Sequence, residues 1–157
     1  MSLRRTRSGM AAALVTALTL LVLPGGATAA DGEEAAPAAA DGNFYAWQYV
    51  TGGGKYCAWY GDDANWSTCS PGGSMRNQAG SIGNRGYPGA YEDVLVYWDN
   101  GDDAGGWDGA RACIQNGWEY YHLYQEFFPN NGAGGTQKLE NNISAHRWVH
   151  ACTENPV

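Results

Sequence analysis

The sequence predicts an all-β domain, a sandwich or barrel of short strands, and three observations support this. The chain beyond residue 41 shows no long amphipathic helical pattern. Short aromatic or β-branched runs alternate with clusters of Gly, Asp and Asn, which is typical of strands joined by tight turns. The 23 glycines of the 157-residue chain supply the positive φ angles that such turns require.

Six segments are expected to form the strands. The first, FYAWQYV, precedes a run of three glycines, and the second, YCAWY, follows that run. Asp-Asn-Gly ends the third segment and Gln-Asn-Gly ends the fourth, and both are turn signals. In chain order the expected strands span residues 44–50, 56–60, 94–98, 110–114, 118–124 and 146–149.

The aromatic residues give this small domain most of its buried area. Seven tryptophans and ten tyrosines lie mainly within the expected strands or directly beside them. Aromatic residues in strands usually pack, so we expect most of them in the core. The alternative is a platform of exposed rings that binds carbohydrate.

The chain also repeats itself, which refines the predicted fold. A cysteine strand, YCAWY, is followed by RNQAGS at residues 76–81, and a second cysteine strand, ARACI, is followed by ENNISA at residues 140–145. The distance from cysteine to asparagine is 20 residues in the first half and 28 in the second. Two such units packed face to face would form a Greek-key sandwich.

The N-terminal part is expected to lie outside this fold. Residues 1–29 combine a basic start, a short apolar run and an Ala-Thr-Ala cleavage site, which predicts a secretory signal peptide. Residues 30–41 are rich in alanine and acid, which predicts a disordered spacer. The folded domain is expected to span residues 42–157, and the protein to be secreted and extracellular.

The charge of the chain excludes some classes of partner. Removal of residues 1–29 takes away three arginines, which leaves six basic residues against sixteen acidic ones, a net charge of −10. Such a chain repels nucleic acid and anionic membrane, so we expect neither as a partner. We expect a monomer.

The four cysteines predict two disulfides, since an even count is typical of small exported domains. Three pairings are possible. Cys57 and Cys69 lie twelve residues apart, and Cys113 and Cys152 share the second half, so we favour Cys57–Cys69 and Cys113–Cys152. A zinc site is disfavoured because the chain has no CxxC pair.

The repeated asparagine segments carry a resemblance to a known family. RNQAGS and ENNISA look like degenerate copies of the motif that marks βγ-crystallin Greek keys. The pattern MRNQAGSIGNRGYPGAYEDVLVYW, GARACI and ENNISAHRW resembles peptidase inhibitor family I36, the Streptomyces metalloproteinase inhibitor family. The resemblance implies a βγ-crystallin-like sandwich of two Greek-key motifs and a secreted inhibitor of extracellular metalloproteases, without catalysis of its own.

An inhibitor of this kind would place a rigid loop in the protease cleft. Three loops are candidates, namely residues 61–70, 99–109 and 129–137. An exposed aromatic residue on a disulfide-tethered loop favours the first, with Trp66, flanked by Asn65 and Ser67, as the predicted docking residues.

Two other functions remain open. The βγ-crystallin motif can bind calcium, and Glu140, Asn141 and Ser144 would form one weak site, although Arg76 in the first copy opposes a cation. We favour a turn-forming role for these residues and expect no other cofactor. The second function is an extracellular module that binds cell-wall glycan through exposed Trp and Tyr. An enzyme is disfavoured, since the sequence shows no HExxH motif and no evident triad.

Overall fold

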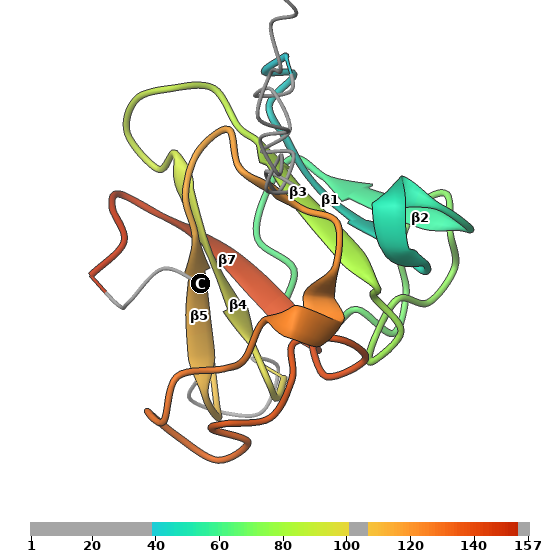
Figure 1. Ribbon diagram of the computed structural model, residues 1–157. Coiled ribbons are helices and arrows are strands. Elements are labelled where there is room, and N and C mark those ends of the chain that lie inside the picture. The colour runs from blue at the N-terminus through green and yellow to red at the C-terminus, as the bar shows by residue number, and fades with distance from the viewer. Residues whose placement is uncertain (1–38, 101–106, 154–157) are drawn as a thin grey trace, which may run out of the picture. The chain divides into compact units, whose positions relative to one another are not determined.

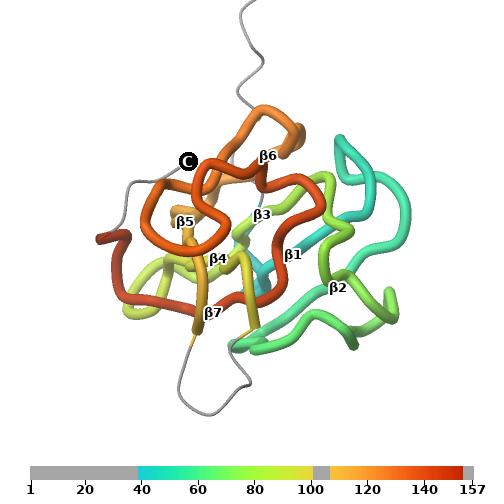
Figure 2. Tube along the Cα trace, turned by 90° about the horizontal axis from the view of Figure 1, so that it is seen from below, coloured from blue at the N-terminus to red at the C-terminus, as the bar shows by residue number. Residues whose placement is uncertain are grey.

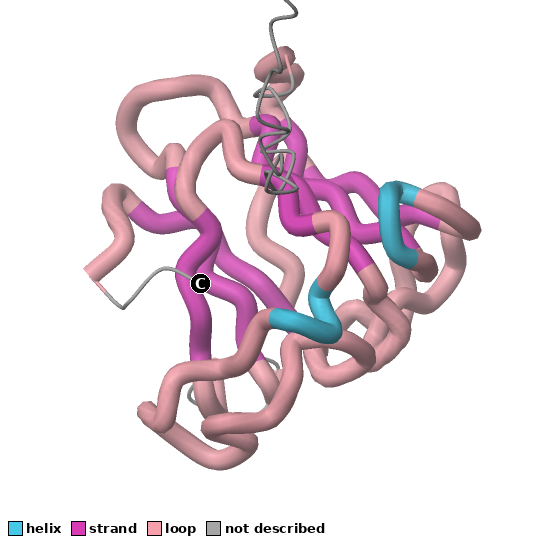
Figure 3. Tube along the Cα trace, viewed as in Figure 1, coloured by secondary structure: helices cyan, strands magenta, loops and turns pink. Residues whose placement is uncertain are grey.

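The computed structural model of the protein describes residues 39–100 and 107–153. These residues form two antiparallel sheets (Figures 1 and 3). These residues belong to one compact unit, Glu34–Val157. The predicted signal peptide and nearly all of the predicted spacer lie outside the described residues, and so stay predictions. Within the described segments, no helix has the length and apolarity needed to cross a membrane.

The first sheet has four strands in the order β2-β1-β3-β6. Side chains alternate along its central strand, so that Phe44 and Ala46 are buried while Tyr45 and Trp47 lie on the outer face. The strands are β1 (Asn43–Trp47), β2 (Tyr56–Trp59), β3 (Ser81–Arg85) and β6 (Glu119–Tyr120). A 3₁₀ turn, η1 (Val50–Gly52), lies between β1 and β2 in the chain.

The second sheet has three strands in the order β5-β4-β7. Its central strand, DVLVY, is buried at every position, which explains its dense β-branched composition. The strands are β4 (Asp93–Tyr97), β5 (Arg111–Ile114) and β7 (Ala145–Val149), and a second 3₁₀ turn, η2 (Leu123–Gln125), follows β6.

Each sheet is completed by a segment from the other half of the chain. β6, from the second half, pairs with β3 of the first sheet (Figure 2). Asp63, from the first half, exchanges two backbone hydrogen bonds with His146 of β7, at 3.0 and 2.9 Å. In each half, the fourth segment pairs beside the first, and the third segment pairs with the opposite sheet. This is a Greek-key arrangement in which the two halves exchange their third segments, namely the segment at Asp63 and β6. The predicted sandwich of two Greek-key motifs is confirmed.

Two elements differ from the prediction. Residues 118–124 form only the two-residue strand β6 and then turn at η2, because Leu123 folds inward and is fully buried. Strand β3, SIGNR, was not predicted because it lacks an aromatic or β-branched run. Its buried Asn84 donates to the carbonyls of Glu92 and Ile114, at 2.9 and 3.1 Å, so that cross-chain hydrogen bonds hold this strand in place.

The core lies between the two sheets and takes residues from both, including Phe44, Ile82 and Val94. Disulfides join Cys57 to Cys69 and Cys113 to Cys152, so the favoured pairing is confirmed. A disulfide of this kind typically contributes about 2–4 kcal/mol, mainly by restricting the unfolded chain.

Candidate functional site

The segment predicted to dock into a protease places its central aromatic residue in the core. The side chain of Trp66 is fully buried and stacks on Trp59 with 4.7 Å between ring centroids. Its indole N–H donates to Nδ1 of His146 at 2.8 Å. The expectation that Trp66 is exposed is therefore wrong. The indole can lie in the core because His146 accepts its N–H, so that burial leaves no unpaired donor.

The neighbours of Trp66 remain near the surface. Ser67 is exposed, Asn65 is half-buried, and the Asn65 side chain accepts a hydrogen bond from the backbone N–H of Ser67 at 3.0 Å. A docking contact through these two residues stays a prediction.

The two asparagine motifs hold the halves of the chain together. The backbone N–H of Asn77 donates to the carbonyl of Ile143 at 2.8 Å, and that of Asn141 donates to the carbonyl of Ala79 at 3.0 Å. Each asparagine thus donates to the residue that lies two positions after the other asparagine. Both adopt a positive φ, 54° for Asn77 and 58° for Asn141. Asparagine tolerates this conformation better than most residues, which explains the residue type at both positions.

The predicted calcium ligands lie in this region, but their donor atoms fit a calcium ion poorly. Ser144 is 1% exposed, and its hydroxyl donates to Oδ1 of Asn77 at 3.0 Å. Glu140 and Asn141 line a neighbouring cavity of about 550 Å³, where Glu140 brings the single carboxylate of the lining. Calcium needs six to eight oxygen ligands, so the geometry supports the turn-forming role. Arg76 is directed to Asp99, with 3.6 Å between Nη2 and Oδ1.

Side chains that can ligate a metal converge at one other place in the described residues. Asp93 lies beside Cys113 and Cys152, whose sulfurs form a disulfide. Both oxygens of Asp93 accept backbone N–H groups, from Asn116 at 2.9 Å and from Cys152 at 2.7 Å. The Asp93 carboxylate therefore stabilises the fold by joining these two segments.

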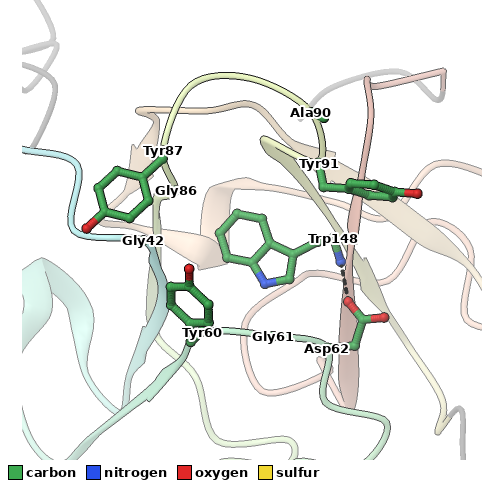
Figure 4. Close-up of a pocket in the computed structure, with 9 residues that line it drawn as sticks. All are labelled: Gly42, Tyr60, Gly61, Asp62, Gly86, Tyr87, Ala90, Tyr91 and Trp148. Carbon is green, nitrogen blue, oxygen red and sulfur yellow. Dashed lines mark hydrogen bonds between the residues drawn. The ribbon is translucent and has the colours of Figure 1, made fainter.

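A concave cluster of aromatic rings is the most distinctive surface feature (Figure 4). Tyr60, Tyr87 and Tyr91 are 75%, 58% and 57% exposed, and they surround the half-buried ring of Trp148. The hollow is open to solvent and measures about 350 Å³, within the range of small-molecule sites. We call it the tyrosine pocket, and its lining includes Gly42, Tyr60, Asp62, Gly86, Tyr87, Tyr91 and Trp148.

Two glycines make the tyrosine pocket possible. A Cβ atom on Gly86 would lie 2.5 Å from the Trp148 ring, so only glycine lets that ring reach the pocket floor. A Cβ atom on Gly42 would lie 2.7 Å from the ring of Tyr87 and 2.9 Å from that of Tyr60, and Gly42 has a φ of +87°. The pocket is therefore shaped by the backbone.

Polar atoms lie beside the rings. Oδ1 of Asp62 accepts the backbone N–H of Trp148 at 2.8 Å, which places a carboxylate at the wall of the pocket. The indole Nε1 of Trp148 is buried and has no hydrogen-bond partner among the described residues. A buried donor without a partner costs about 1–3 kcal/mol.

The tyrosine pocket was not located from the sequence, although exposed aromatic rings were one alternative considered for these residues. Its lining comes from four separated stretches, namely the residue before β1, the segment after β2, the loop after β3, and β7. Proximity of such stretches depends on the exchange between the two Greek keys, and no local pattern reveals it.

Comparison with known proteins gives a likeness of fold only. No protein-family model matches the sequence, and no curated protein matches it. The resemblance to family I36 therefore stays a prediction.

Several solved βγ-crystallin structures resemble this chain in fold. One comes from work on the evolution of the eye-lens βγ-crystallin domain fold, with 13% identity, a TM-score of 0.49, and coverage of 71% of this chain and 89% of that one. An archaeal βγ-crystallin has 15% identity and a TM-score of 0.46, covering 68% and 96%. The Ciona intestinalis βγ-crystallin has 13% identity and a TM-score of 0.46, covering 68% and 99%. The two-Greek-key assignment rests on the strand pairings of this chain.

Proposed function

We propose that this protein is an extracellular binding module without catalytic activity, and that the tyrosine pocket binds a neutral saccharide. The observation that carries the proposal is the concave arrangement of three exposed tyrosines around Trp148. Large exposed apolar side chains gathered in one hollow are costly in water unless a ligand covers them.

The chemistry of the pocket suits a sugar ring. The C–H faces of a pyranose are apolar and pack on aromatic rings, while its hydroxyls need hydrogen-bonding groups at the rim. Tyr60, Tyr87 and Tyr91 supply both a ring face and a phenolic OH. Asp62 adds a carboxylate that accepts hydroxyl donors.

Binding is favoured over hydrolysis by the carboxylate content of the pocket. Glycoside hydrolysis generally uses two carboxyl groups on opposite sides of the bond that breaks. Asp62 is the one acidic residue in the pocket lining, and its Oδ1 is bound to a backbone N–H. A sugar held here is therefore retained intact.

The test uses oligomers of β-1,4-linked N-acetylglucosamine, a neutral cell-wall sugar, titrated into the purified protein by calorimetry. We expect saturable binding that Tyr60→Ala and Tyr87→Ala each weaken by about tenfold, which is about 1.4 kcal/mol. Tyr124→Ala is the matched control, because Tyr124 is 40% exposed and lies outside the tyrosine pocket. Equal binding by all four proteins would refute the assignment of the pocket.

Protease inhibition is the second candidate, and it is supported by the tethered segment 61–70. The Cys57–Cys69 disulfide closes this segment, and Ser67 is exposed on it. A constrained loop loses little conformational entropy when a protease binds it. The test is thermolysin activity on a peptide substrate at fixed calcium. Stoichiometric inhibition that Asn65→Ala or Ser67→Ala weakens would support this function, and unchanged activity at micromolar protein would refute it for that enzyme.

A further inference from the structure

The outer face of the first sheet carries a second group of aromatic side chains. Tyr45 and Trp47 point outward from β1, and their rings stack with centroids 5.4 Å apart and an interplanar angle of 11°. Tyr56 lies opposite Trp47 in the β1–β2 register and is 41% exposed. The outer face of a sandwich sheet is usually polar, so this row of rings needs an explanation.

A charged pair is fixed on top of these rings. The Arg85 guanidinium lies 4.8 Å from the centroid of Tyr45 and 5.5 Å from that of Trp47. Its Nε donates to Oε1 of Glu119 at 2.6 Å, and the Glu119 side chain is only 3% exposed. Tyr121 donates its hydroxyl proton to the other oxygen of Glu119 at 2.5 Å. The buried carboxylate is therefore fully engaged and holds both partners in place.

The backbone makes room for this arrangement. A Cβ atom on Gly83 would lie 2.9 Å from Cγ of Glu119, so glycine lets the glutamate side chain lie across the sheet towards Arg85. Thr51, at the edge of the same hollow, has a φ of +57°, which is rare for a β-branched residue. Backbone strain of this kind often occurs where a site is being shaped.

The resulting cavity measures about 430 Å³. We call it the sheet-face pocket and define it by Tyr45, Trp47, Tyr56, Arg85, Glu119 and Tyr121. Its two charges neutralise each other. Arg85 binds Glu119 through Nε, and the Arg85 side chain is 29% exposed. Donors, phenolic oxygens and ring faces without net charge suit a neutral, hydroxyl-rich ligand.

The residues of the two pockets are joined through the backbone of Arg85. Gly42 of the tyrosine pocket donates its N–H to the carbonyl of Arg85 at 2.8 Å, and Gly86 of the tyrosine pocket follows Arg85 directly. Tyr45 lies three residues along β1 from Gly42, a distance of about 10 Å at the rise of an extended strand. The residues of the two pockets therefore lie close together along β1, which is the separation that a ligand binding at both would have to span.

We infer that the sheet-face pocket is a second saccharide subsite, which binds further units of the same neutral glycan chain that enters the tyrosine pocket. This inference rests on the proposed saccharide function and extends it from one sugar unit to a chain. Joined subsites raise affinity for a long ligand without changing affinity for a short one, because the second contact forms within the same complex.

The test compares the disaccharide and the hexasaccharide of β-1,4-linked N-acetylglucosamine. We expect the hexasaccharide to bind at least about tenfold more tightly. Tyr56→Ala and Trp47→Leu should each remove most of that advantage while leaving disaccharide affinity unchanged. Tyr124→Ala is the control, and melting temperatures show whether each variant is folded. Indole NMR signals map the sites directly: the disaccharide should shift the Trp148 signal, and the hexasaccharide should shift Trp47 as well.

The outcomes separate the two proposals. Disaccharide binding at Trp148 with no gain for the hexasaccharide would overturn the second subsite and leave the tyrosine pocket standing. A gain that survives both variants, with Trp47 unshifted, would also overturn it. Failure of every oligomer to bind at all would overturn the saccharide function and this inference together.

Discussion

Trp66 donates its indole N–H to Nδ1 of His146 at 2.8 Å, although the two residues are 80 positions apart in the sequence. Nε2 of His146 lies 3.0 Å from the carbonyl of Gly61. Since Nδ1 must accept, the proton of the neutral ring resides on Nε2 and is donated to Gly61. Both ring nitrogens are therefore committed, and the histidine joins the segment around Trp66 to β7.

This arrangement predicts that stability falls in mild acid. Burial lowers the pKa of His146 to about 3, while the carbonyl of Gly61 acts in the opposite direction. The unfolded chain, with an ordinary histidine pKa near 6.5, binds the proton first. Between pH 6.5 and about 3 the unfolded state thus holds more protons, so stability is lost as pH falls, by about 1.4 kcal/mol per unit.

Urea unfolding between pH 7 and pH 4 measures this effect, and His146→Gln should flatten the dependence. Burial raises the pKa of nearby Asp63, which acts in the opposite direction near pH 4, so the upper part of the range is the clearer one. His122→Gln, at an exposed histidine, is the control. An equally steep dependence without His146 would contradict the explanation.

The hydrogen bond itself is tested by Trp66→Phe. The smaller ring leaves space in the core and leaves Nδ1 of His146 without a donor, so both effects reduce stability. We expect a loss of about 3 kcal/mol in the free energy of unfolding. Ser67→Ala next to it, at an exposed position, should change stability by less than about 0.5 kcal/mol. A small effect of Trp66→Phe would mean that the core repacks around the site.

Trp66 also illustrates how far the sequence could predict this molecule. Strands β1, β2, β4 and β5 were foreseen because aromatic or β-branched runs end at clear turn residues. Nothing local distinguishes Trp66, in a Gly-Asp-Asn-rich segment, from an exposed loop residue, because its partner His146 lies in the other half of the chain. Strand β3 was missed for the same reason, since cross-chain contacts through Asn84 stabilise it.

The disulfides were predictable because each pair lies within one half, and the repeat separates the halves. The tyrosine pocket was not predictable in position, since it forms where the ends of β1, β2 and β3 meet β7. Its individual residues carry no unusual signal, as tyrosine beside glycine is frequent in any turn-rich β domain. Only the spatial arrangement of Gly42, Gly86 and Trp148 identifies it.

The geometry of the asparagine motifs predicts that calcium does not stabilise the protein. Ser144 is engaged with Asn77, and Glu140 is the single carboxylate of the neighbouring cavity. We expect millimolar calcium to leave the melting temperature unchanged relative to a chelator. Ser144→Ala should destabilise the protein by about 1–2 kcal/mol equally in both conditions, because it removes a buried hydrogen bond. A calcium-dependent rise in melting temperature that Ser144→Ala abolishes would establish a metal site instead.

The shape of the tyrosine pocket is tested through Gly86, a lining residue that has no side chain of its own. A Cβ at Gly86 would lie 2.5 Å from the Trp148 ring, so Gly86→Ala must displace that ring from the floor. We expect about tenfold weaker disaccharide binding and a loss of about 1–3 kcal/mol in stability from the overpacking. Gly61→Ala is the matched control, since a Cβ there meets nothing within 4 Å although Gly61 lines the same pocket.

If Gly86→Ala binds the disaccharide as the parent does, the position of Trp148 is irrelevant to recognition. If Gly61→Ala weakens binding equally, the loss comes from the pocket rim, and the floor formed by Trp148 is not the contact that holds the sugar.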